Sequence, residues 1–190
     1  MNTLTGLRDV FYSGSYAFSG MNEPIAEIAF LIDEGYLAFH AVSIAEKHEY
    51  FSCIDDLSAR KHAYDEAAGG ENAHIALKLM AGKYIERSHN RKVQFEKPFC
   101  GYYPDVVSDD GSIVIECGHT QNPDKMLDYF RLGNIHECIQ IPYPDPDDDM
   151  VRGYSFAVGS PTTCEFLEFL AKDRRSKVKE LLSKRDSKYS

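Results

Sequence analysis

The chain has 190 residues, 43 % of them apolar, which is enough to bury roughly 70 % of its unfolded surface in one compact domain. No apolar window of about 18 residues could cross a bilayer and no leader segment is recognisable, so we expect a cytoplasmic protein without membrane association. The formal net charge of −9 excludes a protein that coats nucleic acid without specificity, because phosphate neutralisation requires clustered Lys and Arg.

The first 70 residues predict a β-rich extension packed on the rest of the domain. Residues 1–20 show no lasting period and are interpreted as a short strand or a loop. Within residues 26–44, β-favouring side chains lie on both sides of the Asp-Glu-Gly segment at 33–35, so a β-hairpin of two antiparallel strands is expected there. Residues 55–70 are charged and end in two glycines, which indicates a linker or a loosely held helix.

Residues 71–145 predict six elements in the order helix, strand, strand, strand, helix, strand. Apolar positions at helical spacing, with alanines between them, indicate a helix from Glu71 to about Arg87. Three strands follow in the segments VQFEKPF, YYPDVV and IVIECG, and the last is apolar enough to be buried on both faces. A second helix, PDKMLDYFRL, has Pro123 in its first turn, and IHECIQIPYP supplies the fourth strand.

Residues 146–190 are expected to complete the same domain with a strand and a basic helix. The strand is predicted around 154–158, and Thr162 or Thr163 is the expected N-cap of the helix that follows. Residues 171–190 hold eight Lys and Arg against three Asp and Glu. Such a tail could hold DNA phosphates, although a solvated helix end is the commoner outcome.

Two carboxylates are expected to converge at one end of the predicted sheet. Asp105 follows Pro104 on one strand, and Glu116 ends the next strand, across a tight turn at Asp110 and Gly111. Two carboxylates about 4 Å apart repel by roughly 4 kcal/mol at an effective dielectric constant near 20, so such a pair needs a cation, a shared proton or separation. A hard divalent ion is the natural partner, since Mg²⁺ accepts carboxylate oxygens and retains waters that can attack phosphorus.

This part of the sequence resembles the PD-(D/E)XK superfamily of restriction-endonuclease-like and Holliday-junction-resolvase-like nucleases. The resemblance rests on the Pro-Asp pair, the ten residues that follow it and the apolar strand that ends in Glu116. The α-β-β-β-α-β core of that superfamily matches the order predicted for residues 71–145. The resemblance implies an α/β fold with a mixed central sheet flanked by helices. It also implies that Asp105, Glu116 and the carbonyl of Cys117 bind Mg²⁺ or Mn²⁺.

One position departs from the pattern of the superfamily. The signature Lys, two positions after the glutamate, is Gly118 here, and a glycine can neither orient a water nor neutralise charge developing on phosphorus. Loss of one such group typically costs about 3 to 4 kcal/mol of transition-state stabilisation. Either a side chain from another position takes over the role of this lysine, or the site is degenerate and the fold serves to bind a partner.

Glu71 or His74, on the preceding helix, lies where many members of the superfamily place a further polar ligand or phosphate contact.

Several side chains could replace the missing Lys. Lys125, on the second predicted helix, is the preferred replacement, and Gln121 could hold a water or a phosphate oxygen. Lys78 and His119 are alternatives. A lone Lys is more often a solvent-facing helix residue, and this interpretation applies most strongly to Lys78, because long cations commonly lie along a helix flank.

The first hypothesis is therefore a divalent-metal-dependent DNA endonuclease, for which the resemblance also points to a homodimer. The alternative is a catalytically degenerate accessory protein that keeps the fold to bind DNA or a protein partner, and an RNA-directed nuclease fits the same residues. No GxxxxGK[ST], GxGxxG, GxSxG or HExxH motif is present, so no nucleotide cofactor, serine hydrolase or zincin is expected. The five cysteines include no CxxC pair and are expected to be reduced thiols.

Overall fold

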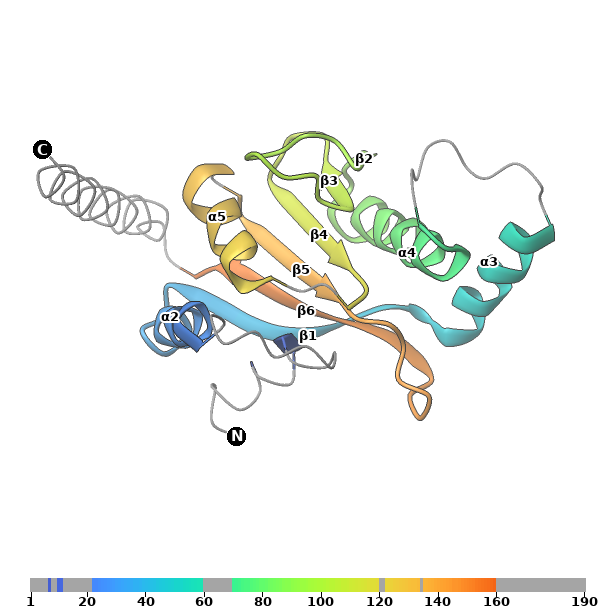
Figure 1. The fold of residues 1–190 in the computed structure, drawn as a ribbon, viewed down its shortest axis with the longest axis horizontal. Coiled ribbons are helices and arrows are strands. Elements are labelled where there is room, and N and C mark those ends of the chain that lie inside the picture. The colour runs from blue at the N-terminus through green and yellow to red at the C-terminus, as the bar shows by residue number, and fades with distance from the viewer. Residues whose placement is uncertain are drawn as a thin grey trace, which may run out of the picture.

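The computed structural model describes residues 7, 10–11, 22–59, 70–119, 122–133 and 135–159. Within these ranges the chain forms one six-stranded sheet with helices on both faces (Figure 1). In chain order the elements are α2 (Asn22–Asp33), β1 (Leu37–Glu46), α3 (Lys47–Ala59), α4 (Asn72–His89), β2 (Val93–Phe95), β3 (Val106–Ser108), β4 (Ile113–Cys117), α5 (Pro123–Gly133), β5 (Glu137–Ile141) and β6 (Met150–Val158).

The strands of the sheet follow the order β1-β6-β5-β4-β3-β2. The pair β4 and β5 runs parallel, and the four other neighbouring pairs run antiparallel. A parallel pair requires a crossover connection, which α5 provides. The predicted α/β class with a mixed sheet flanked by helices is confirmed, as is the order helix, strand, strand, strand, helix, strand from α4 to β5.

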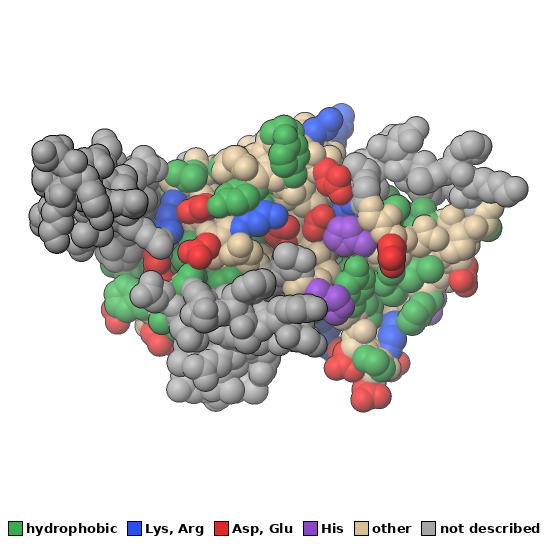
Figure 2. Space-filling model, viewed as in Figure 1, with side chains coloured by type: hydrophobic (Ala, Val, Ile, Leu, Met, Phe, Trp, Pro, Cys, Tyr) green, Lys and Arg blue, Asp and Glu red, His purple; other side chains and the backbone are tan. Residues whose placement is uncertain are grey.

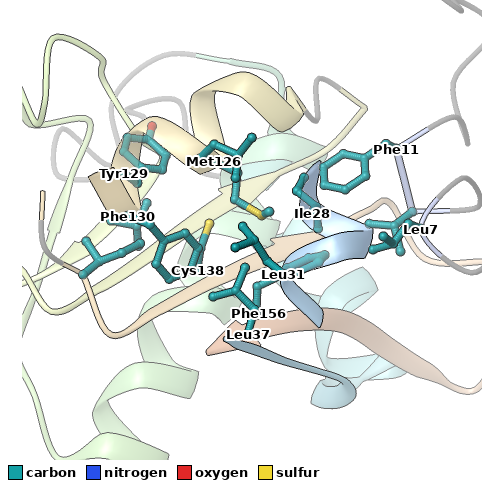
Figure 3. Close-up of a cluster of buried hydrophobic side chains, with 14 of the residues drawn as sticks. Leu7, Phe11, Ile28, Leu31, Leu37, Met126, Tyr129, Phe130, Cys138 and Phe156 are labelled. Carbon is teal, nitrogen blue, oxygen red and sulfur yellow. The ribbon is translucent and has the colours of Figure 1, made fainter. Parts of the chain in front are cut away.

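Two clusters of buried apolar side chains fill the layers on either side of the sheet. The first lies under α2 and α5 and includes Leu31 and Phe156 (Figure 3), and the second lies under α3 and α4. Side chains of the fully buried strand β4 alternate between them, with Val114 in the first cluster and Ile115 in the second. Because side chains along a strand alternate between faces, Glu116 lies on the face covered by α5.

The strands β1 and β6 close one side of the sheet. They pair from Leu37, opposite Val158, along most of their length, and the register shifts between Ser43 and Ala45, as at a β-bulge. The opposite edge is β2, which has three residues. Residues before 70 and after 145 therefore contribute strands to the same sheet as the segment between them.

The hairpin predicted over residues 26–44 is wrong in its first half. Residues 22–33 form α2, and the strand that follows pairs with β6 instead of a hairpin partner. Ile25, Ile28 and Leu31 are all buried and lie at intervals of three, so the helical period outweighs the β propensity of the individual residues. Gly35 does turn the chain, but as a helix C-cap: its N–H and the next residue's N–H bond back to α2 carbonyls, as in a Schellman motif.

Other segments differ from the predictions in extent. Residues 55–59 belong to the end of α3, and the last strand begins at Met150 rather than near residue 154. The predicted C-terminal helix and the basic residues 171–190 lie outside the described residues, as does most of 1–20. No helix in the described ranges is both long and apolar enough to cross a membrane.

Candidate functional site

Asp105 and Glu116 lie at the same end of the sheet, as predicted. Val106 pairs with Ile115 across the β3–β4 hairpin, so Asp105 stands opposite Glu116, one step beyond that pair. The Asp105 carboxylate accepts a hydrogen bond from the backbone N–H of Cys117 at 2.7 Å, which ties the entrance of β3 to the exit of β4. Strand pairing thus places the two acids at the same end of the hairpin.

Asp105 is held from the side of α4. The imidazole Nε2 of His74 lies 3.1 Å from the second Asp105 carboxylate oxygen, and the Asp105 side chain is 13 % exposed. His74 lies in the first turn of α4, and its imidazole Nδ1 would lie 3.4 Å from a Cβ atom placed on Gly118, just after β4. Of the two polar residues predicted on this helix, His74 reaches the site, whereas Glu71 is exposed at the start of α4.

Glu116 is held from the other face, by α5. One carboxylate oxygen accepts a hydrogen bond from the Tyr129 hydroxyl at 2.5 Å and lies 2.7 Å from the Lys125 ammonium nitrogen. These two α5 residues are four apart, so they project from the same side of the helix. In Figure 3 the Tyr129 hydroxyl points away from the apolar cluster on which its ring packs. The predicted replacement lysine therefore contacts a predicted metal-binding acid.

Burial and charge act in opposite directions on Glu116. Desolvation in its buried position raises the pKa of the Glu116 carboxyl, and the positive charge of Lys125 and the hydrogen bonds from Lys125 and Tyr129 lower it. Burial, together with the Glu116 charge, raises the pKa of the Tyr129 phenol far above its usual value, so Tyr129 remains a hydrogen-bond donor. The Lys125 ammonium also lies 5.8 Å from the centre of the Tyr129 ring and 5.9 Å from that of Tyr102.

Gly118, at the position where the resemblance predicts a lysine, has a backbone that disfavours any larger residue. Its φ is +87°, a left-handed conformation that side-chain-bearing residues rarely adopt. A Cβ atom here would lie 3.3 Å from the Tyr143 ring and 3.4 Å from the imidazole Nδ1 of His74. The place where a lysine side chain would begin is thus already lined by two rings, which explains the departure from the motif in physical terms.

Lys78 does not lie along a solvent-facing flank of α4, and that interpretation is wrong. Its side chain is fully buried, and its ammonium lies 2.5 Å from the carboxylate of Glu96, which follows β2. The charge is tolerated at this depth because a carboxylate compensates it. Lys78 lies close enough to Cys117 to lower the pKa of that thiol, against a larger rise caused by burial. It is therefore on the α4 side of the sheet, away from the Lys125 face.

The surroundings of the two acids combine charges of both signs. Figure 2 shows acidic, basic and histidine side chains together over α5 and the exit of β4. A cavity of about 470 Å³ opens nearby, lined in part by His119, Tyr143 and Arg152, and the rings of His119 and Tyr143 are 4.6 Å apart. His119 therefore lies against Tyr143 at the cavity rather than against the acids. The predicted catalytic residue Gln121 lies outside the described residues.

The donors at the site suit a hard cation. Mg²⁺ is usually held by one or two carboxylates together with waters and substrate oxygens, and Asp105 and Glu116 provide two carboxylates on adjacent strands. In the described part of the chain, no group of three or more His, Cys, Asp or Glu side chains is arranged to hold a metal ion. Any ion here would thus depend on these two acids, backbone carbonyls such as that of Cys117, and other oxygen donors.

Two residues beside Glu116 were not predicted. From the α5 sequence, Tyr129 would be interpreted as an aromatic residue of the core, and only the fold shows that its hydroxyl contacts Glu116. Gln140 is 1 % exposed and pairs with Glu116 in the parallel β4–β5 register. A lone amide in the otherwise apolar run CIQI is the signal that could have identified it.

No protein-family model, curated protein or solved structure matches the chain.

Proposed function

We propose that this protein is a divalent-metal-dependent endonuclease that hydrolyses phosphodiester bonds in DNA. The observation that carries the proposal is the pair Asp105 and Glu116, which are held at adjacent strand ends with a lysine of the following helix on one of them. The order of elements from α4 to β5, within a mixed sheet, supports a restriction-endonuclease-like core. Asp105, Glu116 and the carbonyl of Cys117 would hold Mg²⁺ or Mn²⁺.

Each residue of the site has a separate task in this proposal. A bound divalent ion would supply an activated water and neutralise charge on the phosphate. His74 and the Cys117 N–H fix the orientation of the Asp105 carboxylate, so that little reorganisation is needed when a ligand arrives. Lys125 keeps a positive charge 2.7 Å from Glu116, within reach of a phosphate oxygen bound beside that acid.

Lys125 takes the role of the signature Lys in this proposal. The left-handed backbone at Gly118 and the rings beside it oppose a lysine at the usual position. A cation entering from α5 meets neither obstacle and reaches Glu116 across the other face of the sheet. The positive charge of the signature lysine would then come from another position in the chain but act at the same site.

One observation favours a second function, that of a degenerate nuclease-fold protein that binds DNA or a protein partner. Asp105 already has His74 beside it, and Glu116 already has Lys125. Acids that already have partners among the chain's own side chains do not require a metal ion. The net charge of −9 also favours a partner other than bare DNA.

Cleavage assays test the first function directly. Plasmid DNA and labelled oligonucleotides, with RNA as a comparison, would be incubated with Mg²⁺ or Mn²⁺ and the wild type, Asp105→Ala, Glu116→Ala or Asp109→Ala. Asp109 is the matched control, since it is an exposed acid in the turn at the far end of the same hairpin. We expect cleavage to fall at least about 100-fold in the first two variants and to persist in the third.

The outcomes separate the two functions. Equal cleavage by all four proteins would remove the nuclease proposal, because a contaminant would then explain the activity. Calorimetry with Mn²⁺ gives an independent measurement. A wild type that takes up no Mn²⁺ at millimolar concentration and cuts nothing supports the accessory function.

A further inference from the structure

Gln140 is a buried polar residue with an unpaired atom. Its side chain is 1 % exposed, and its amide nitrogen lies 3.5 Å from the sulfur of Cys138, which is a weak contact. Its amide oxygen is buried and has no hydrogen-bond partner among the described residues. Leaving a buried acceptor unsatisfied costs about 1 to 3 kcal/mol. A leucine or methionine would avoid this cost, so the amide calls for an explanation beyond packing.

The position of Gln140 points to the acids. In the parallel pairing of β4 and β5, Gln140 stands opposite Glu116, as Cys138 stands opposite Val114. Cys138 and Val114 both belong to the cluster under α5, so Gln140 and Glu116 lie on that same face. Asp105 lies just before β3 at the same end of the sheet, where its carboxylate contacts the Cys117 N–H and His74 of α4. Two oxygen-bearing side chains, those of Gln140 and Glu116, thus occupy equivalent places on β5 and β4, and Asp105 lies at the same end of the sheet.

We infer that Gln140 is a third oxygen donor of the proposed metal site, which binds the ion through its amide oxygen or holds a water bound to the ion. This inference rests on the proposed function. Amide oxygens are hard donors of the kind that Mg²⁺ and Mn²⁺ accept. A neutral donor also adds no third negative charge beside Asp105 and Glu116, whereas a carboxylate would add repulsion.

A purely structural role for Gln140 accounts for less of what is observed. The contact with Cys138 engages the amide nitrogen and leaves the oxygen without a donor. Turning the amide over would place the oxygen beside the thiol but leave the NH₂ group unpaired. In the observed orientation the amide oxygen lacks the partner that a bound ion, or a water on it, would provide.

Two substitutions separate the roles by effects of opposite sign. Gln140→Leu removes the unpaired oxygen, so we expect a higher melting temperature without metal and a Mn²⁺ affinity about 10- to 100-fold lower than that of the wild type. Gln140→Glu buries a charge beside Glu116, so we expect a lower melting temperature without metal and a Mn²⁺ affinity at least as high as that of the wild type. Ile139→Val is the control, because Ile139 is buried in the same strand but belongs to the opposite cluster.

Calorimetric titration with Mn²⁺ and thermal unfolding with and without Mn²⁺ provide the readouts. Equal Mn²⁺ affinity of the wild type and Gln140→Leu overturns the inference and leaves the nuclease proposal standing. A loss of affinity that Ile139→Val shares to the same extent also overturns it, since strand packing would then be the cause. A wild type that binds no Mn²⁺ removes both proposals together.

Discussion

Asp105 and Glu116 lie at the same end of one hairpin, yet the chain holds them by different means. Asp105 is bound by an imidazole and a backbone N–H and keeps some contact with solvent. Glu116 is 6 % exposed and depends on the charge of Lys125 and on the hydroxyl of Tyr129. A backbone N–H and an imidazole hold the first acid, whereas the positive charge of a lysine offsets the burial of the second.

This contrast indicates how each acid would respond to a ligand. Asp105 is oriented in advance and would change little, because both of its oxygens already have donors. Glu116 shares one oxygen between two donors, and Lys125 would have to adjust if an ion took its place. The α5 side is therefore the side where substitution should have the largest consequences for stability.

Removing the cation from the α5 side should have the largest effect on stability. In Lys125→Met, Glu116 loses its compensating charge, and we expect the free energy of unfolding at pH 7 to fall by about 3 kcal/mol. Burial raises the pKa of Glu116 in the folded state. A carboxyl whose pKa is raised by folding favours the folded state while it is protonated, and this contribution is lost as pH rises through the raised pKa. The difference in unfolding free energy between Lys125→Met and the wild type should therefore shrink toward pH 4.

Denaturant unfolding at pH 4 and pH 7 would measure this effect. Lys83→Met is the control, since Lys83 is an exposed lysine of α4. A deficit in Lys125→Met that is equal at both pH values would contradict the dependence of Glu116 on Lys125.

Restoring the signature lysine should have an intermediate effect, and an unfavourable one. Gly118→Lys forces a side chain onto a backbone with φ of +87° and against Tyr143, so we expect a loss of about 2 kcal/mol in stability. We also expect no gain in DNA cleavage, because Lys125 already supplies the charge. Gly118→Ala separates the backbone strain from the longer side chain. Faster cleavage by Gly118→Lys than by the wild type would show that the position still needs a cation.

The α4 side should show the smallest effect. His74→Leu removes one donor to Asp105 and leaves the other, the N–H of Cys117. Because the carboxylate stays partly solvated, we expect a loss of about 1 kcal/mol in unfolding free energy, measured in the same denaturant series. A loss as large as that of Lys125→Met would mean that the two acids depend equally on their partners, which would contradict the difference between Asp105 and Glu116.

The sequence predicts the part of the site that depends on local order. The turn at Asp110 and Gly111, between two short strands, was enough to place Asp105 opposite Glu116. Lys125 could be chosen because a helix following β4 must return across the sheet to begin the parallel strand β5. These inferences require only the order of elements and the length of one hairpin.

Other features depend on partners that are distant in sequence. The burial of Lys78 requires Glu96, which lies eighteen positions further along. The reason for Gly118 lies in two rings, one on α4 and one after β5. In the segment that became α2, β-favouring residues obscured a helical spacing that only packing against the sheet reveals. Such pairings cannot be read from a local pattern.

The unequal edges of the described sheet bear on where another strand could be added. An unpaired strand edge offers free N–H and C=O groups to any other chain. At one edge β2 provides only three residues, too few for a stable added strand. At the other edge β1 is ten residues long, and the bulge between Ser43 and Ala45 interrupts the regular ladder that an incoming strand would need. Among the described residues, the short length of β2 limits strand addition at one edge, and the irregular register of β1 limits it at the other.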